Sequence, residues 1–143
     1  MTVEVEVRNR ARIVLDEAAA ASVLRAALAA EGVTDGEVGL AVVGRSEMAR
    51  LNNVHRGRLD ATDVLSFPLD MRDALPPGVP RQLGDVVICP SVARTQGTPL
   101  EHLLVHGALH LVGYDHEADD GKMIARQEEI VEEIAARAAA RPS

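Results

Sequence analysis

Three of the five histidines lie within eleven residues, and their spacing is the feature of the chain most suggestive of chemistry. His106 and His110 are four residues apart, so on a helix their side chains project from the same face one turn apart. Gly113 predicts the end of that helix, because glycine readily takes the left-handed conformation that turns a chain back. This turn would bring His116 round to the same point in space. Three neutral imidazoles with a fourth position left open are typical of catalytic rather than structural zinc.

The histidine spacing can be compared with that of the metzincin proteases, which carry His-Glu-x-x-His-x-x-Gly-x-x-His. The three ligands and the turn glycine match, but Gly107 stands where those proteases have a glutamate as general base. The sequence therefore predicts the metal geometry of such a site without the base for peptide cleavage. The alternative is that the histidines are ordinary surface or core residues of a helix, and the complete spacing disfavours it.

Length and composition indicate one domain over residues 1–143 with an aliphatic core. A chain of this length buries roughly 68–70% of its unfolded surface, enough for a core without disulfides. Hydrophobic residues make up 47% of the chain, but Trp is absent, and Phe67 and Tyr114 are the single Phe and Tyr. So few aromatic side chains disfavour an RNA-recognition module that stacks bases on an aromatic sheet.

Cysteine content and the lack of long apolar runs indicate the compartment. The single Cys89 allows no disulfide within the chain, which fits a reducing environment. The first residues include Glu4 and Glu6 rather than the apolar run of a signal peptide. No stretch approaches the roughly 18 apolar residues of a membrane span. We therefore expect a cytoplasmic protein with no membrane partner.

Charge is unevenly distributed along the chain. The net charge of −7 argues against bulk electrostatic binding of nucleic acid. Residues 101–133 carry nine acidic and two basic side chains, so the remainder is neutral overall. Residues 45–58 form a locally basic segment, with four arginines against one glutamate. We expect a polyanion to be held at that segment by a protein that is acidic elsewhere.

Apolar periodicity and turn residues predict interleaved strands and helices. The valines of residues 3–7 alternate with charged residues, which is the pattern of a half-buried strand. Further strands are expected over 38–43, 63–67 and 86–89, and helices over 16–31, 46–56, a short stretch from Pro90 to Gly97, the ligand helix from Thr98 onward, and 120–140. This order predicts a four-stranded sheet packed with about five helices.

Two polar residues are expected to cap helices. Ser46 stands where the helix through Arg56 begins. Thr98 and Glu101 have the spacing of a capping box, with Pro99 at the first helical position. Thr98 is therefore expected to fix the start of the ligand helix, and a cap of this kind stabilises a helix by about 1 kcal/mol.

Four motifs together resemble the YbeY family of bacterial endoribonucleases, the ribosomal RNA maturation factors. The histidine motif is the most specific of them, and the order and separations of all four match. One departure is His55, where the family usually has a tyrosine. In chain order the motifs are Leu51-Asn52-x-x-His55-Arg56, Thr62-Asp-Val-Leu-Ser-Phe-Pro68, Gly84-Asp-Val-Val-Ile-Cys89, and His106 to His116 followed by Glu117.

The resemblance carries expectations about fold, chemistry and partners. It implies a single zincin-like α+β domain with a four-stranded mixed sheet, and one zinc ion on His106, His110 and His116. It also implies cleavage of single-stranded RNA, 3′-end maturation of small-subunit ribosomal RNA, and a role in ribosome quality control. The implied partners are single-stranded RNA and the small ribosomal subunit with its proteins, and not DNA. The arginine that matches Arg56 is essential in that family.

Several alternatives stand beside this interpretation. A zincin-like peptidase is disfavoured by Gly107, and a non-catalytic ribosome-assembly factor would use zinc for folding alone. The open fourth ligand position and Arg56 favour catalysis, because phosphoryl transfer depends on positive charge. Two roles fit Arg56, which are binding the scissile phosphate and satisfying the last carbonyls of its helix. Two nucleophiles fit the site, which are a water activated by zinc and the RNA 2′-hydroxyl.

Overall fold

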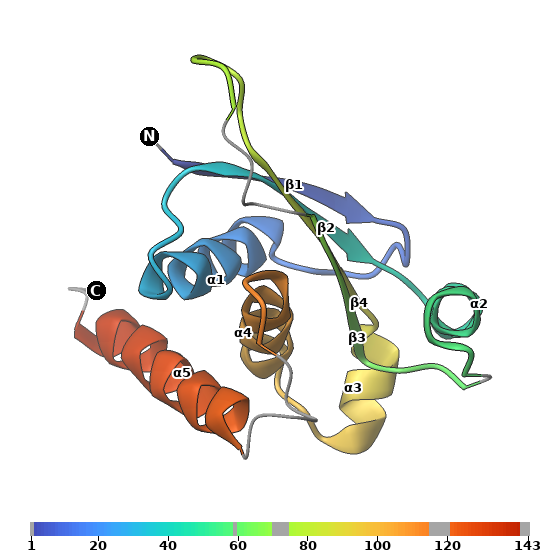
Figure 1. The fold of residues 1–143 in the computed structure, drawn as a ribbon. Helices are drawn as coiled ribbons and strands as arrows, with labels where there is room; N and C mark the ends of the chain where they lie inside the picture. Colours follow the sequence, from blue (N-terminus) through green and yellow to red (C-terminus); the bar gives the residue numbers. More distant parts are fainter. Residues whose placement is uncertain (1, 59, 70–74, 115–120, 141–143) are drawn as a thin grey trace.

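The computed structural model describes residues 2–58, 60–69, 75–114 and 121–140, and within these ranges the chain forms one sheet and five helices (Figure 1). The strands are β1 (Val3–Asn9), β2 (Gly36–Val42), β3 (Val64–Pro68) and β4 (Gln82–Ile88). The helices are α1 (Glu17–Ala30), α2 (Arg45–Arg56), α3 (Pro90–Gln96), α4 (Leu100–Leu111) and α5 (Lys122–Ala140). The expected α+β fold with a four-stranded mixed sheet is confirmed.

The sheet has the strand order β1-β2-β4-β3, with β3 as an antiparallel edge strand. β1 pairs with β2 and β2 pairs with β4, both in parallel. α1 connects β1 to β2, because parallel neighbours need a long crossover rather than a tight turn. β3 pairs with β4 from Val64 opposite Ile88 to Pro68 opposite Gly84.

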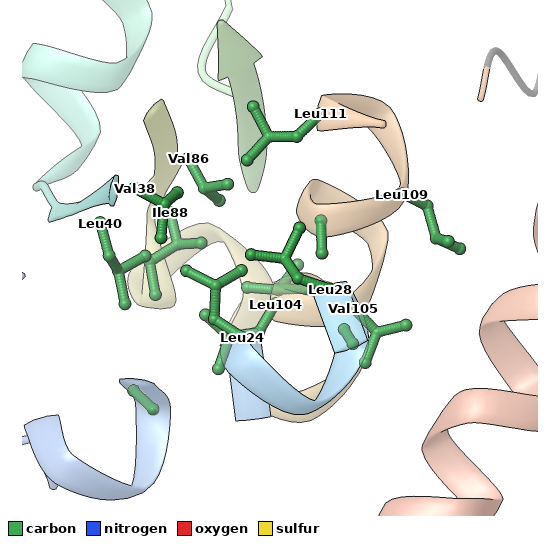
Figure 2. Close-up of a cluster of buried hydrophobic side chains, with 14 of the residues drawn as sticks. Leu24, Leu28, Val38, Leu40, Val86, Ile88, Leu104, Val105, Leu109 and Leu111 are labelled. Carbon is green, nitrogen blue, oxygen red and sulfur yellow. The ribbon is translucent and has the colours of Figure 1, made fainter. Parts of the chain in front are cut away.

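α4 lies at the centre of the molecule, between the sheet and two other helices (Figure 1). It contacts β3 and β4, and also α1 and α5. A helix surrounded in this way is apolar on most of its circumference, as its sequence is. Figure 2 shows Leu104 and Leu111 of α4 in one cluster with Leu24 of α1 and Val86 of β4. The buried residues of α4 are Leu103, Leu104, Val105, Gly107, Ala108, Leu109 and Leu111.

A smaller apolar cluster lies on the other face of the sheet, near the β3 edge. It joins Met48 of α2 to Leu65 of β3 and Val87 of β4. Successive residues of a strand point to opposite faces, so Val64 and Val86 belong instead to the cluster around α4. α2 and α4 therefore flank the same edge of the sheet from opposite sides.

The predicted capping box at the start of α4 does not form. Pro99 occupies the N-cap position, and no side chain caps the helix. The reason lies in α3, whose last turn ends at Gly97 with a φ of 74°. The Thr98 amide donates to the carbonyl oxygen of Ala93 at 2.9 Å, which completes the closing turn of α3. Thr98 thus belongs to the end of one helix rather than to the start of the next.

The predicted Ser46 cap of α2 is also wrong. Gly44 is the N-cap residue, the helix begins at Arg45, and no side chain caps it. Arg45 fixes this end of α2 by another route, because its guanidinium donates to the hydroxyls of Ser91 and Thr95 on α3. The first turn of α2 is therefore tied to α3.

β4 begins at Gln82, four residues before the predicted start at residue 86. Gly84 and Asp85 interrupt the apolar pattern of the strand, so the sequence does not predict that it extends back to Gln82. Gly84 has a φ of 125°, and a Cβ there would lie 2.3 Å from the carbonyl oxygen of Phe67. The glycine thus permits the close approach of the edge strand β3. Cys89, predicted to be a small buried residue, is fully buried just beyond this strand.

The C-terminal helix α5 packs mainly through its first half. Met123 and Ile130 are buried, and Val131 and Ile134 are partly buried, as their spacing predicts. Ala138, predicted on the same face, is exposed. In the described part of the chain, no helix is long and apolar enough to cross a membrane.

Candidate functional site

α4 carries His106 and His110 one turn apart, and both are half-buried. Their rings meet edge to face, with centroids 4.8 Å apart and an angle of 75° between the ring planes. The structure therefore brings together two of the three predicted metal ligands. The apolar contacts of the rest of α4 fix the face on which the two rings stand.

Each of the two imidazoles is held through its Nδ1 atom by an oxygen. His106 Nδ1 lies 2.8 Å from Gln127 Oε1, and His110 Nδ1 lies 2.9 Å from the carbonyl oxygen of Tyr114. Both oxygens only accept, so each Nδ1 carries the proton and donates it. The lone pair of each neutral ring is then on Nε2. This is the tautomer of a histidine that ligates a metal through Nε2, so the donor set fits a zinc ion.

The turn after α4 holds His110 as well as ending the helix. Gly113 has a φ of 107°, and its amide donates to the His110 carbonyl oxygen at 3.1 Å. The Tyr114 amide donates to the Leu109 carbonyl oxygen at 3.0 Å. These two bonds form a Schellman motif, as the position of Gly113 predicts. The same turn places the Tyr114 carbonyl oxygen beside the His110 ring.

The third predicted ligand, His116, lies outside the described residues, as does its neighbour Asp115. Among the residues that are described, no group of three His, Cys, Asp or Glu side chains is placed to hold a metal ion. The role of His116 therefore stays a prediction.

Gly107 lies on the face of α4 that touches the sheet. A Cβ at this position would lie 2.6 Å from Val86 Cγ1 and 3.4 Å from Val64 Cγ2. The Ser66 hydroxyl donates to the Gly107 carbonyl oxygen at 2.9 Å, so β3 meets the helix here as well. A glutamate at this position would be aimed at β3 and β4, where there is no room for it. The loss of the metzincin base is thus built into the packing of α4.

Arg56 is the last residue of α2, and it is exposed. The chain enters β3 eight residues later at Val64, which lies beside Gly107. α2, which ends at Arg56, and α4, which carries His106, flank one edge of the sheet from opposite faces. His55 packs on Phe67 with ring centroids 4.4 Å apart, so the histidine keeps an aromatic contact at the position where a tyrosine is usual. The catalytic role of Arg56 stays a prediction.

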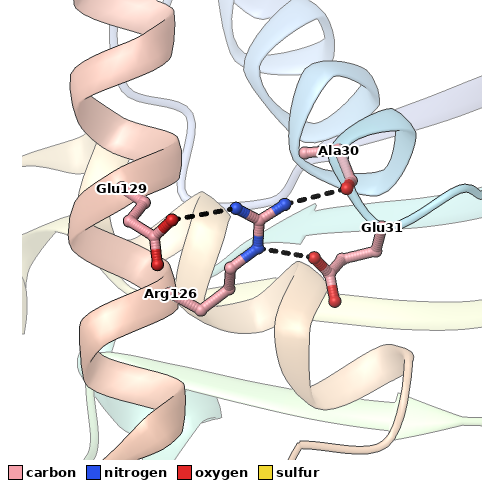
Figure 3. A network of polar contacts seen from close by, with 4 residues as sticks. All are labelled: Ala30, Glu31, Arg126 and Glu129. Atoms are coloured by element: carbon pink, nitrogen blue, oxygen red, sulfur yellow. Dashed lines mark hydrogen bonds and ion pairs between the residues drawn. The ribbon is translucent and has the colours of Figure 1, made fainter.

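A polar network links α5 to the end of α1 (Figure 3). Arg126 of α5 donates to Glu31 at 2.7 Å and to the carbonyl oxygen of Ala30 at 2.9 Å. A hydrogen bond to the Glu31 carboxylate, with burial adding to it, raises the pKa of Tyr114 above its ordinary value of 10.0. Glu31 therefore ties α5 to the end of α1, and its charge acts on the Tyr114 hydroxyl beyond α4.

Two supporting groups were not identified from the sequence, namely Gln127 and the Tyr114 carbonyl oxygen. Gln127 is buried on the inward face of α5, between Met123 and Ile130. A polar residue on an apolar stripe is a signal in itself, because buried polar groups need partners. The identity of that partner is not encoded locally, since His106 is 21 residues away.

A hollow of about 800 Å³ lies on the face of the sheet away from α4. Its walls mix acidic side chains with two arginines, and neither His106 nor His110 lines it. Its charged lining includes Glu4, Glu6, Arg8, Arg10, Glu37 and Asp85. Four carboxylates against two guanidinium groups do not suit a polyanion. We therefore place the candidate site at the two histidines rather than in this hollow.

Comparison with known proteins gives a consistent picture. The model of a family described as Endoribonuclease YbeY matches residues 4–135. A relative of that name from Alkaliphilus metalliredigens is 40% identical over 139 residues, covering 90% of this chain and 86% of the relative. Another from Acinetobacter baylyi is 45% identical over 96 residues, covering 61% of this chain. The match spans only 60% of that second relative's own length.

A solved structure shows the same architecture. The solution structure of TM1509 from Thermotoga maritima superposes with a TM-score of 0.56 at 26% sequence identity. The superposition covers 99% of this chain and 94% of that one. The similarity therefore extends over the whole sheet and all the described helices.

The close contact at Gly107 generates a test of how α4 is seated. We expect Gly107→Ala to lower the free energy of unfolding by up to about 2 kcal/mol, because overpacking typically costs 1–3 kcal/mol and is offset by a gain of roughly 1 kcal/mol in helix propensity. In the double variant with Val86→Ala, the clashing methyl groups are gone, so the two changes should couple by about 0.5–3 kcal/mol. Urea unfolding of the four proteins measures both values. Additive effects of the two substitutions would contradict the proposed contact.

Proposed function

Because the chain belongs to the YbeY family, whose model and relatives are described as endoribonucleases, we propose that it is a zinc-dependent endoribonuclease acting on single-stranded RNA. One observation carries this proposal. His106 and His110 stand on one face of α4 with their Nδ1 atoms donating to oxygens, which is the tautomer of a histidine that ligates a metal through Nε2. The packing at Gly107 argues against peptide cleavage by a metzincin-type base.

His106, His110 and His116 are the residues that would hold the zinc ion. When bound, zinc supplies positive charge that polarises a phosphoryl oxygen. α4 and the turn at Gly113 keep the first two rings in place without a metal, so the chain does not have to reorganise around the ion. Pre-organised ligands of this kind are typical of catalytic sites.

Arg56 is proposed to bind the scissile phosphate. Its planar guanidinium forms two parallel hydrogen bonds with a phosphate, and cleavage builds up charge there. Two charged residues of the basic segment 45–58 are bound elsewhere in the structure. Arg45 is bound to α3, and Glu47 pairs with Arg10. The alternative role, capping the end of α2, is in part taken by the Gly57 amide, which donates to the Asn53 carbonyl oxygen at 2.9 Å. Arg56 is thus exposed at the end of its helix.

We further propose that the substrate is the 3′ end of small-subunit ribosomal RNA and that the protein acts in ribosome quality control. The support for this is the family resemblance together with the charge distribution. α5 exposes four glutamates, at positions 128, 129, 132 and 133. An acidic helix face of this kind suits contact with basic ribosomal proteins rather than with RNA.

Cleavage assays with and without chelator test the metal and the substrate class. We expect the protein to cut a single-stranded RNA but not the same sequence in a duplex, and to lose activity on chelation and regain it with zinc. His110→Ala should lose both zinc and activity with its helix content intact, because one of three ligands is gone. His102→Ala is the matched control on the same helix and should keep one zinc per chain.

Two results would contradict this proposal. Zinc-loaded protein that leaves every single-stranded RNA intact would favour a ribosome-assembly factor in which the metal serves folding. Chelator-sensitive hydrolysis of casein by the same preparation would restore the peptidase interpretation.

Substitution of Arg56 distinguishes a phosphate site from a helix end. We expect Arg56→Ala to lower the rate of RNA cleavage by about 100–1000-fold, since a charge-stabilising donor is lost. The rate of RNA cleavage should also fall clearly in Arg56→Lys, because lysine keeps the charge but lacks the planar guanidinium that binds phosphate through two hydrogen bonds. Zinc content and melting temperature should be nearly unchanged in both. Arg94, in the last turn of α3 before Gly97, is the matched helix-end arginine, and Arg94→Ala should cleave normally. Wild-type rates in Arg56→Ala would remove Arg56 from the site.

A further inference from the structure

We infer that Gln127 is a positioning residue for His106, which fixes the protonation and the orientation of that ring before any metal binds. The inference rests on the proposed metal site. Gln127 Oε1 accepts from His106 Nδ1 at 2.8 Å across the contact between α5 and α4. The side chain of Gln127 therefore decides which ring nitrogen of His106 keeps its lone pair.

The surroundings of Gln127 make this contact specific. The residue is buried, with 8% of its surface exposed, and its neighbours on the same face of α5 are the buried Met123 and Ile130. A buried amide oxygen without a donor is costly, and apolar neighbours offer none. With the Gln127 amide oxygen facing the ring at 2.8 Å, a proton on Nε2 of His106 would leave Nδ1 and Oε1 facing each other as two acceptors. In this arrangement the pair is satisfied by the tautomer that leaves the lone pair on Nε2.

Arg126, the residue before Gln127 on α5, holds this part of the helix in place. Arg126 is held by Glu31 at 2.7 Å and by the Ala30 carbonyl oxygen at 2.9 Å, both at the C-terminal end of α1 (Figure 3). Its guanidinium is only partly exposed, so this ion pair is less screened than one on the open surface. The contact with α1 therefore fixes the position of α5 along its axis relative to α4, and with it the position of the Gln127 amide.

The same carboxylate also lies near the residue that supports the second ring. The Tyr114 carbonyl oxygen holds His110 Nδ1 at 2.9 Å, and the Glu31 carboxylate is close enough to the Tyr114 hydroxyl to act on it electrostatically. Both supports thus lie near Glu31, since Gln127 follows Arg126 on α5 and Tyr114 belongs to the turn after α4. Oxygen acceptors behind metal-ligating histidines set ring orientation and ligand basicity. Gln127 is the member of this set that a side-chain substitution removes without altering the backbone.

Nuclear magnetic resonance of the metal-free protein tests the inference without relying on activity. At a pH well above the ordinary histidine pKa of about 6.5, the ring nitrogen shifts of wild-type His106 should report a proton on Nδ1. Gln127→Met keeps the length of the side chain but removes the acceptor, and should give a mixture of tautomers. Gln127→Glu retains an acceptor and should restore the Nδ1 proton.

Zinc affinity, measured by competition with a chromophoric chelator, provides the second readout. Gln127→Met should bind zinc roughly 10–100-fold more weakly than wild type, the usual effect of removing such a support. Gln127→Glu should remain within a few-fold of wild type. Glu128→Met, at the adjacent exposed position of α5, is the matched control and should bind as wild type does. Melting temperatures of the metal-free proteins show that each variant is folded.

The outcomes separate this inference from the proposed function. A proton on Nε2 of wild-type His106 would overturn the inference, and so would wild-type zinc affinity in a folded Gln127→Met. If Gln127→Met does not fold, the inference is tested by the His106 tautomer of the wild-type protein and by the tautomer and zinc affinity of Gln127→Glu. If the wild-type protein binds no zinc, the proposed function fails, while the tautomer of His106 still tests the role of Gln127.

Discussion

The packing of α4 against the sheet at Gly107 is the contact on which the rest of the site depends. At this point the helix comes so close to Val86 that no side chain fits between them. The Ser66 hydroxyl donates to the Gly107 carbonyl oxygen from the adjacent edge strand. A helix seated so closely cannot rotate about its axis without steric overlap, because cores are packed to near-crystalline density. The direction of His106 and His110 therefore follows from the apolar contacts on the opposite sides of α4.

The supports of the two histidines come from different parts of the chain, yet they meet. α5 supplies the Gln127 oxygen, and the turn after α4 supplies the Tyr114 carbonyl oxygen. Glu31, at the end of α1, binds Arg126, the residue before Gln127, and so fixes α5 beside α4. Segments far apart in sequence thus supply the oxygens that hold the two rings. The same seating leaves no room for a protease-type glutamate, so the fold offers metal ligands while excluding that base.

Features set by local periodicity could be predicted from the sequence. The four-residue spacing of His106 and His110 and the glycine turn at Gly113 both appear in the structure, because each depends only on helix geometry and on backbone freedom. The start of α4 could not be predicted in the same way, since Thr98 is used by the end of α3. The support from Gln127 escaped prediction because it joins two residues 21 positions apart on different helices. His116 lies outside the described residues, so its part in the site still rests on the motif.

X-ray absorption at the zinc edge of the zinc-loaded protein tests the central claim most directly, because it counts the atoms around the metal. The claim is that two pre-oriented rings on α4 and one ring beyond the turn form an open three-histidine site. The account predicts a four-coordinate shell with three imidazole nitrogens at about 2.0–2.1 Å and one oxygen ligand. A shell with fewer than three imidazoles, or one that includes the sulfur of Cys89, would contradict it.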